Sequence, residues 1–485
     1  MRIFLSRTIG AEALGVYQVA LSVFMVLLTV VSSGLTLIVS RMTASYRVSK
    51  DKKATGSLVS SALILSVVVS IILCIVVLIF KNLFAKLFTD ENCINILIIL
   101  LPSLIFSAVY SVFRGAMWGC DNYFALCISE LFEMVVKIIF SVLLLNAGMS
   151  VLKSAQNVAW SFTFSCALSA VFVVVLYFVY GGRLSRPTKI YKTVLSRSAP
   201  ITGVRIVGSL VQPLIALILP ARLILAGYTA SQAMSIYGIA LGMTFPLLFL
   251  PTTLTGALST ALVPDIAMAM TKNDSEHIQK RVTSSVNFAL FISFLAMAMF
   301  VAVGDKIGLF LYGEALSGTL LQFSSWIMIP MGVTNVTSAI LNSAGLEVKS
   351  FVNYIIGGVF TFISIMWLTS FMGVLSLPFG MGISTLITMQ LNLFMLKRKL
   401  NIKVKIWKNL FGFFLLSLPP ILITSFMCGL LDNFLPLFLN LTISGLLGVG
   451  CYLALCLTFN VVNIHYYFAK VKEKFKIKVQ KRQKR

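Results

Sequence analysis

Charged residues are scarce in this sequence. Only 11% of its 485 residues are charged and 59% are hydrophobic, with a mean hydropathy of +0.98, whereas about a quarter of the residues in a typical soluble chain are charged. A soluble protein of this size cannot hide so many apolar side chains, because over half of any folded surface is already apolar. The low charge excludes a water-soluble enzyme and indicates that lipid is the solvent for most of the chain.

Several motifs of catalytic chemistry are also missing. The sequence has two histidines, His277 and His465, and eight cysteines without a CxxC pair, which argues against a His-based metal site, a catalytic triad and a disulfide framework. It contains no GxxxxGK[ST] motif for nucleotide phosphates, and its loops are too short for a soluble catalytic domain. We therefore expect neither an enzyme nor a bound metal or cofactor.

Long apolar runs dominate the sequence instead. A transmembrane helix needs about 20 apolar residues, and thirteen runs meet this length. Met1 to Leu5 resemble the end of a further helix, so we expect an all-α polytopic membrane protein with about fourteen transmembrane helices, the first of them truncated. The thirteen runs are 14–40, 54–80, 94–117, 122–146, 157–180, 198–219, 233–263, 284–304, 318–342, 350–371, 378–396, 409–430 and 435–463.

Basic residues gather in alternate loops. If 14–40 runs from outside to inside, 29 of the 39 Lys and Arg residues lie in inside loops and six in outside loops. The positive-inside rule then predicts a multi-pass protein of the cytoplasmic membrane with both termini in the cytoplasm. The net charge of +24 is thus explained without nucleic acid. The basic tail at 464–485 is expected to lie on anionic phospholipid headgroups.

Two pairs of segments suggest an internal repeat. Tyr17-Gln-Val-Ala-Leu-Ser-Val resembles Tyr237-Gly-Ile-Ala-Leu-Gly-Met, and Pro102…Gly119 resembles Pro330…Gly345. Each pair is separated by six predicted helices, which favours two parallel six-helix lobes with substrate bound between them; chance similarity of apolar sequence is the alternative. The expected divisions are 1–183 and 184–400 for the lobes, 401–463 for two additional helices, and 464–485 for the tail.

Three apolar runs carry ionisable residues at helical spacing. An ionisable side chain at the centre of a membrane span costs roughly 2.5–3.5 kcal/mol on insertion scales, so it usually faces a cavity or a partner. We expect the three polar stripes to line one aqueous cavity. They are Ser103, Ser107, Tyr110, Ser111 and Arg114; Glu130, Glu133, Lys137 and Ser141; and Ser198, Thr202, Arg205, Ser209 and Gln212.

Basic residues outnumber acidic ones within these spans. The basic residues are Arg2, Arg114, Lys137 and Arg205, and the acidic ones are Glu130 and Glu133. A net cationic cavity suits an anionic substrate, and guanidinium groups suit phosphate. Two alternatives stay open: Glu133 and Lys137 neutralise each other at i, i+4, or Arg114 extends to the headgroups.

Several motifs together resemble one family of transporters. They are Leu5-Ser-Arg-Thr-Ile-Gly-Ala-Glu12, Arg114-Gly-Ala-Met-Trp-Gly119, Ser129-Glu-Leu-Phe-Glu133 and the segment Leu250–Pro264, which reads LPTTLTGALSTALVP. The chain resembles, over nearly its whole length, the stage V sporulation protein B group. This group belongs to the oligosaccharide and lipid II flippases of the MOP (multidrug/oligosaccharidyl-lipid/polysaccharide) superfamily. The chain departs from the group at Trp118 and Glu130, where Gln is more usual, and the group's usual start lies upstream of Met1.

The resemblance implies a flippase that passes a polyprenyl-pyrophosphate-linked saccharide, an anionic lipid-linked sugar, between leaflets by alternating access. It assigns the pyrophosphate to Arg2, Arg114 and Lys137, and we add Arg205 and Gln212 to this predicted substrate site. We expect Glu133 to orient Lys137, and Glu130 to couple transport to a cation, with Na+, H+ or the membrane potential as the source of energy. The alternatives are a cation-coupled multidrug exporter and a non-transporting membrane partner of cell-wall synthesis enzymes.

Overall fold

The chain folds into helices that divide between two compact units. The computed structural model describes residues 1–49, 51–146, 148–187, 190–271, 274–400, 402 and 406–459, in which every regular element is a helix. Unit 1 comprises Met1–Met243 and Ile365–Val374, and unit 2 comprises Thr244–Ser364 and Leu375–Arg485. The predicted basic tail at 464–485 lies outside the described residues.

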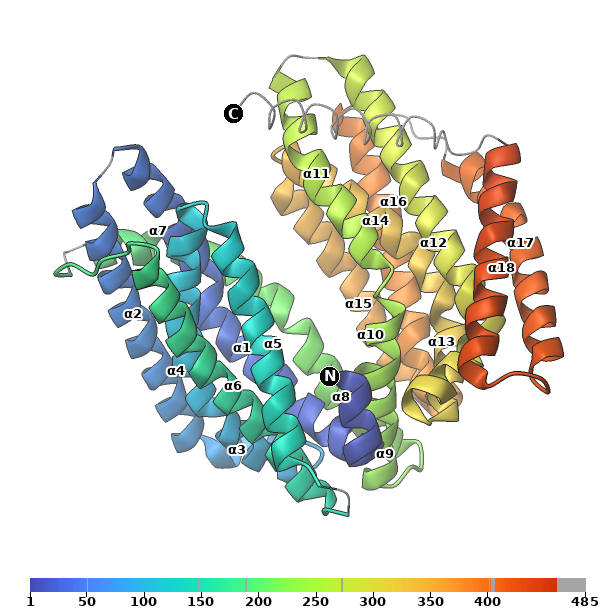
Figure 1. Ribbon diagram of the computed structural model, residues 1–485, viewed down its shortest axis with the longest axis horizontal. Helices are drawn as coiled ribbons and strands as arrows, with labels where there is room; N and C mark the ends of the chain where they lie inside the picture. The colour runs from blue at the N-terminus through green and yellow to red at the C-terminus, as the bar shows by residue number, and fades with distance from the viewer. Residues whose placement is uncertain are drawn as a thin grey trace. The chain divides into compact units, whose positions relative to one another are not determined.

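Unit 1 is a bundle built around one long helix, α1. The helices α4, α6, α7 and α9 all pack on it, and Figure 1 shows α1 inside the blue and green group of helices. Its helices are α1 (Arg2–Val48), α2 (Lys52–Ile79), α3 (Lys81–Leu87), α4 (Asn92–Gly119), α5 (Tyr123–Leu144), α6 (Val151–Val179), α7 (Ile190–Ser209), α8 (Val211–Leu225) and α9 (Ala230–Tyr237), followed by a π-helix (Gly238–Thr244). Because α7, α8 and α9 pack on α1, the compact unit extends past residue 183, where the lobe boundary was expected.

The first residues form a short helical segment at the start of α1. Met1 to Leu5, predicted to be the end of a separate helix, lie in this segment, which the non-helical Gly10 (φ 76°, ψ 174°) separates from the long part of α1. Glycine adopts this conformation without the steric cost that a Cβ imposes. A short segment with Arg2 near its beginning therefore changes direction at Gly10 before the long part of α1 begins.

Three loops that the sequence predicts to be cytoplasmic meet at one end of unit 1. They are 41–53, 118–121 and 181–197. Arg47 at the end of α1 donates a hydrogen bond to Asp121 in the α4–α5 turn, with 2.6 Å between Nη1 and Oδ2. The Tyr177 hydroxyl of α6 donates to the carbonyl of Arg183 at 3.3 Å. Residues from all three loops line a cavity of about 420 Å³. The alternation of loops along unit 1 is as expected; the side of the membrane on which they lie stays a prediction.

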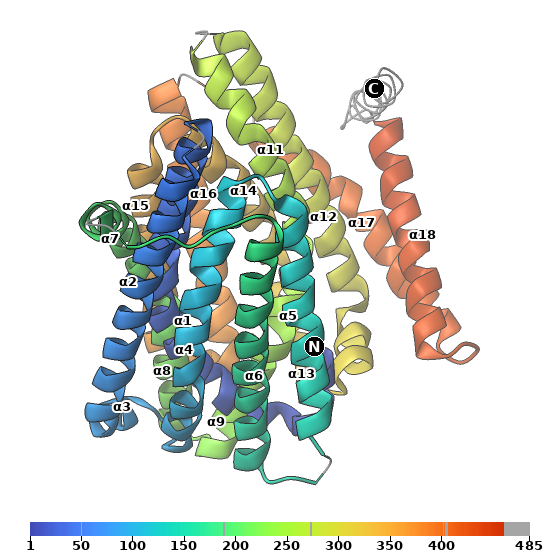
Figure 2. The same ribbon diagram turned by 60° about the vertical axis from the view of Figure 1, so that its left-hand side comes forward.

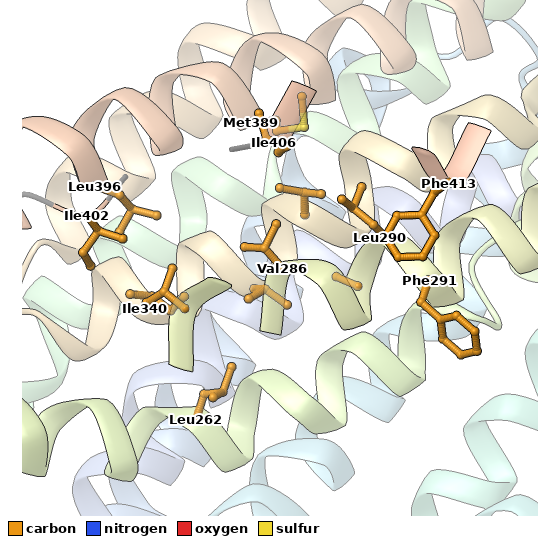
Figure 3. Packing of buried hydrophobic residues seen from close by; sticks show 14 of the residues in the cluster. Leu262, Val286, Leu290, Phe291, Ile340, Met389, Leu396, Ile402, Ile406 and Phe413 are labelled. Atoms are coloured by element: carbon orange, nitrogen blue, oxygen red, sulfur yellow. The ribbon is translucent and has the colours of Figure 1, made fainter. Parts of the chain in front are cut away.

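Unit 2 is a second bundle, with a dense apolar core. Figure 3 shows Val286, Leu290 and Phe291 of α12 beside Ile340 of α14 and Phe413 of α17, and Figure 2 shows α17 and α18 as a hairpin. Its helices are α10 (Phe245–Leu248), α11 (Thr252–Thr271), α12 (Ser275–Tyr312), α13 (Ala315–Ser324), α14 (Met328–Ser343), α15 (Glu347–Met372, divided between the units), α16 (Ser376–Leu400), α17 (Ile406–Leu431) and α18 (Leu437–Thr458), with short 3-10 turns at Ser325–Ile327 and Gly373–Leu375.

A buried polar network ties three helices of unit 2 together. The Asn353 side chain of α15 donates to Asn392 Oδ1 of α16 at 2.9 Å. Asn392 in turn donates to Thr337 Oγ1 at 3.2 Å and to Ser338 Oγ at 2.9 Å, both on α14. Both asparagines are at most 2% exposed, so these amides depend on one another for their hydrogen bonds.

Replacing Asn392 by leucine should lower the stability of unit 2. The apolar side chain has nearly the same size, but it leaves the buried amide of Asn353 without its acceptor, which costs roughly 1–3 kcal/mol. The measurement is the midpoint of thermal unfolding in detergent or nanodiscs. Asn409→Leu is the matched control, because Asn409 pairs with Asn287 in a less buried position. Equal midpoints for wild type and Asn392→Leu would contradict the network's role.

Most predicted spans coincide with long apolar helices. Nine helical stretches in the described part of the chain are long and apolar enough to cross a membrane. The count is ten if Ala230–Leu248 and Thr252–Thr260, which meet at a bend of 54°, form one span. Helix α5 has 22 residues, which is long enough to span a membrane. Because it carries Glu130, Glu133 and Lys137, its composition alone does not identify it as a span. The predicted total of fourteen stays a prediction.

Candidate functional site

Five of the predicted site residues lie close enough to interact within unit 1. Arg114 on α4 forms an ion pair with Glu130 on α5. Glu133, one turn further along α5, interacts electrostatically with Arg114 and Glu130 on one side and with Lys137 on the other. Lys137 interacts with Arg2 as well. We call Arg2, Arg114, Glu130, Glu133 and Lys137 the charged cluster.

The ion pair Arg114–Glu130 joins α4 to α5. Arg114 lies near the end of α4 and Glu130 near the start of α5, on either side of the turn at Asp121. Its side chains keep 40% and 52% of their surface exposed, so the pair is open to a ligand. Glu130 was predicted to couple transport to a cation; the structure places it as the counter-ion of Arg114. An anionic ligand at Arg114 would therefore compete with the Glu130 carboxylate.

Lys137 is held by an aromatic ring. Its Nζ lies 4.3 Å from the centroid of the Phe162 ring on α6, within the range of a cation–π interaction. Glu133 attracts this ammonium group and Arg2 repels it. Among the described residues Lys137 has no direct ion pair with Glu133, although the two side chains attract each other, and their mutual neutralisation stays a prediction.

Arg2 reaches the site from the short segment before Gly10. Its Nη1 donates to the carbonyl of Leu241 at 3.2 Å. Leu241 lies in the π-helix Gly238–Thr244, and the widened turn of a π-helix disturbs the regular i→i−4 pairing of carbonyls. The guanidinium of Arg2 thus satisfies a carbonyl of this irregular turn while it lies within electrostatic reach of Lys137 and Tyr17.

Two hydrogen bonds fix α4 against α5 and α6 around the cluster. Ser107 of α4 donates to the Cys166 sulfur of α6 at 3.8 Å. The hydroxyls of Tyr110 and Ser129 share a hydrogen bond of 3.4 Å between α4 and α5. Together with the Arg114–Glu130 ion pair, these bonds place the polar stripe of α4 beside α5. The aqueous cavity that the stripes were expected to line stays a prediction.

The third predicted stripe packs elsewhere on α1. Arg205 of α7 donates from Nη1 to the carbonyl of Ser33 at 3.1 Å, and Thr202 lies against Gly34. The predicted span 198–219 is split at Leu210 between α7 and α8, and Gln212 is exposed at the start of α8. The structure does not join Arg205 or Gln212 to the charged cluster, and their role in substrate binding stays a prediction.

Phe162 is the member of this region that sequence reasoning missed. It lies in the run 157–180, which carries no Asp, Glu, Lys, Arg or His. In such a run a phenylalanine is expected to take part only in apolar packing. The missing signal is its position opposite Lys137, which depends on how α5 and α6 pack together. No spacing within either helix predicts that contact.

The cluster combines three cations with two carboxylates. Arginine can bind phosphate through two parallel hydrogen bonds, and lysine binds it as a point charge. The three cations come from α1, α4 and α5, so a ligand that engaged all of them would bridge three helices. This arrangement suits an extended anion with more than one phosphate oxygen.

Comparisons with known proteins agree with this architecture. Residues 1–270, more than half of the chain, match the family described as polysaccharide biosynthesis protein. Stage V sporulation protein B of Bacillus subtilis (strain 168) is 22% identical over 370 residues, which cover 73% of this chain and 71% of that protein.

Two solved structures with similar folds are both transporters. The lipid II flippase MurJ in an inward closed conformation has a TM-score of 0.72 at 17% identity and covers 94% of this chain and 95% of its own. A multidrug resistance MATE family transporter of the MOP superfamily in an inward-facing conformation has a TM-score of 0.68 at 16% identity, covering 82% and 93%. The chain is thus an all-α multi-pass membrane protein that shares the fold of these two transporters and belongs to the polysaccharide biosynthesis protein family.

Proposed function

We propose that the protein carries a polyprenyl-pyrophosphate-linked saccharide, a precursor of the lipid II or polysaccharide type, across the cytoplasmic membrane by alternating access. Membership of the polysaccharide biosynthesis protein family supports a saccharide cargo. The fold shared with the lipid II flippase MurJ and with a MATE transporter supports transport, and MurJ supports a lipid-linked sugar. The observation that carries the proposal is the charged cluster, with cations from three helices of unit 1.

The charge of the cluster favours an anionic substrate. Arg2, Arg114 and Lys137 exceed Glu130 and Glu133 by one positive charge, and the Arg114 guanidinium already binds a carboxylate. A pyrophosphate carries more charge than one carboxylate and offers several oxygens to the planar guanidinium fork. We infer that the pyrophosphate displaces Glu130 from Arg114 during binding.

A multidrug exporter is the main alternative, since transporters of that kind share the fold. An exporter of cationic drugs would need carboxylates that are free to attract the substrate. Here Glu130 is already neutralised by Arg114, and Glu133 has both Arg114 and Lys137 within electrostatic reach. A non-transporting partner of cell-wall synthesis enzymes is the second alternative.

The test is a flipping measurement in vesicles that contain the purified protein. A lipid-linked saccharide with a fluorescent NBD group on its sugar is placed in both leaflets, and dithionite quenches the NBD groups that become accessible outside. We expect quenching of the inner pool within minutes, against a slow leak in protein-free vesicles, and no acceleration for an NBD-labelled phosphatidylcholine. Vesicles with Na+ gradients, pH gradients or a membrane potential would identify the energy source.

Two results would overturn the proposal. Vesicles that accumulate ethidium but leave the lipid-linked saccharide unflipped would favour the multidrug alternative. Vesicles that move neither compound under any gradient, with correctly folded protein, would favour the non-transporting partner.

A further inference from the structure

The contact between Lys137 and Phe162 places a cation and an aromatic ring together inside an apolar bundle. The ring centroid is 4.3 Å from Nζ, and the Phe162 side chain is only 6% exposed. A cation–π contact is stronger when it is desolvated than at an exposed site. The burial of Phe162 therefore favours a strong contact.

A second ring holds Phe162 in place. Phe24 of α1 meets it edge to face, with ring centroids 5.6 Å apart and planes at 82°. Phe24 is fully buried, and such T-shaped pairs are favourable beyond the area that they bury. The contacts Phe24–Phe162 and Phe162–Lys137 therefore connect α1 through α6 to α5 and fix the position of the ammonium group.

We propose that Phe162 is a positioning residue that holds the Lys137 ammonium for an anionic substrate, here the pyrophosphate; the inference rests on the proposed function. A ring has no net charge, so it holds the ammonium without cancelling its charge. The N–H groups that point away from the ring stay free to donate to phosphate oxygens. A direct ion pair with a carboxylate would hold Lys137 equally well, but a substrate phosphate would then have to displace it.

The contrast with Arg114 supports this division of roles. Arg114 is paired with Glu130, and a ligand must compete with that carboxylate. Lys137 has Cys166 and Glu133 within electrostatic reach, but its direct contact is with a neutral ring. Lys137 is thus positioned without the direct carboxylate pairing that Arg114 has.

The contact itself is tested without substrate. The thermal unfolding midpoints of Lys137→Met, Phe162→Leu and the double variant form a double-mutant cycle. We expect the double variant to lose clearly less than the sum of the two single losses. Phe164→Leu, combined with Lys137→Met, is the matched control: Phe164 is on the same helix and packs on Trp160 and Phe140, so its losses should add. Additive losses for Phe162 would overturn the inference.

The effect on substrate is tested by fluorination of the ring. Incorporating 4-fluoro-, 3,5-difluoro- and 3,4,5-trifluorophenylalanine at position 162 weakens the negative face of the ring while nearly preserving its size. We expect the affinity for undecaprenyl pyrophosphate in nanodiscs to fall stepwise, to roughly one tenth for the trifluoro ring. The same series in the Lys137→Met background should be flat.

The two proposals fail in different ways. If the wild type binds undecaprenyl pyrophosphate and Lys137→Met weakens it, but the fluorinated series is flat, Phe162 is not a positioning residue and the proposed function stands. If the wild type binds no pyrophosphate lipid, the proposed function fails, and the thermal cycle still decides whether the ring and the cation are coupled. An additive cycle contradicts the inference whatever the substrate.

Discussion

Replacing Arg114 by alanine is expected to reduce flipping of the lipid-linked saccharide by about 100-fold, because a hydrogen bond to a charged group contributes roughly 1.5–3 kcal/mol and each 1.4 kcal/mol is about tenfold. Arg114 offers the planar fork that matches phosphate oxygens, and it lies at the end of the cluster where the exposed ion pair with Glu130 leaves room for exchange. The measurement is the dithionite assay, with binding of undecaprenyl pyrophosphate as the second readout.

The double variant Arg114→Ala with Glu130→Gln separates two explanations of that loss. The single variant leaves the Glu130 carboxylate without its counter-ion, which by itself can disturb α5. The double variant removes both charges and so removes that disturbance. Flipping that stays low in the double variant means that Arg114 acts on the substrate, whereas recovered flipping would mean that it only neutralises Glu130. Glu130→Gln alone should bind the pyrophosphate lipid more tightly, because the competing carboxylate is gone.

Arg205→Ala belongs in the same series as a comparison. From the sequence alone, this variant is predicted to abolish transport. Its guanidinium donates to the carbonyl of Ser33, and among the described residues it forms no ion pair with the charged cluster. A loss equal to that of Arg114→Ala, with normal folding, would place Arg205 in the substrate site; a small loss would assign it to the packing of α7 on α1.

Replacing Gly238 by valine is expected to prevent stable folding of unit 1. A Cβ at Gly238 would lie 2.7 Å from the backbone nitrogen of Gly15 and closer still to the carbonyl of Ala11, and Gly15 faces the backbone of Met234 in the same way. These neighbours are backbone atoms, so they cannot turn aside as a side chain does. Inserting a larger side chain into a packed core costs about 1–3 kcal/mol of stability. We expect Gly238→Val to lose at least the upper value, because α1 and α9 would have to move apart.

Thermal unfolding and the yield of monodisperse protein measure this effect. Gly203→Ala is the matched control within unit 1, because a Cβ there meets nothing within 4 Å and alanine favours a helix by up to about 1 kcal/mol over glycine. We expect Gly238→Val to be recovered in low yield with a clearly lower midpoint, and Gly203→Ala to match or exceed the wild type. A Gly238→Val protein as stable as the wild type would show that α1 and α9 do not cross as closely as the structure places them.

The helices were largely predictable because each depends on local sequence. An apolar run of about 20 residues has few options in lipid other than a helix, since its backbone must satisfy its own hydrogen bonds. The breaks were harder to predict. The expected run 198–219 is divided at Leu210, and the segment after Tyr237 widens into a π-helix. The π-helix has a partner far away in the sequence, because Arg2 donates to the carbonyl of Leu241.

The charged cluster was predicted in part. Helical spacing placed Glu130, Glu133 and Lys137 on one stripe of α5, and the cost of burying charge in a membrane marked them as functional. Spacing within a helix does not identify the partner on another helix. The pairing of Arg114 with Glu130 depends on the packing of α4 against α5, and the hydrogen bond from Arg205 to Ser33 depends on the packing of α7 against α1.

The sequence by itself determined the environment and the class of this protein, because hydropathy and the distribution of basic residues act through the solvent and need no knowledge of long-range contacts. Its motifs also indicated the family. Only the tertiary structure decided which cations share a site and how each is held, because contacts such as Lys137 with Phe162 join residues on different helices. The distance between such residues is set by helix packing, which no local pattern along the chain encodes.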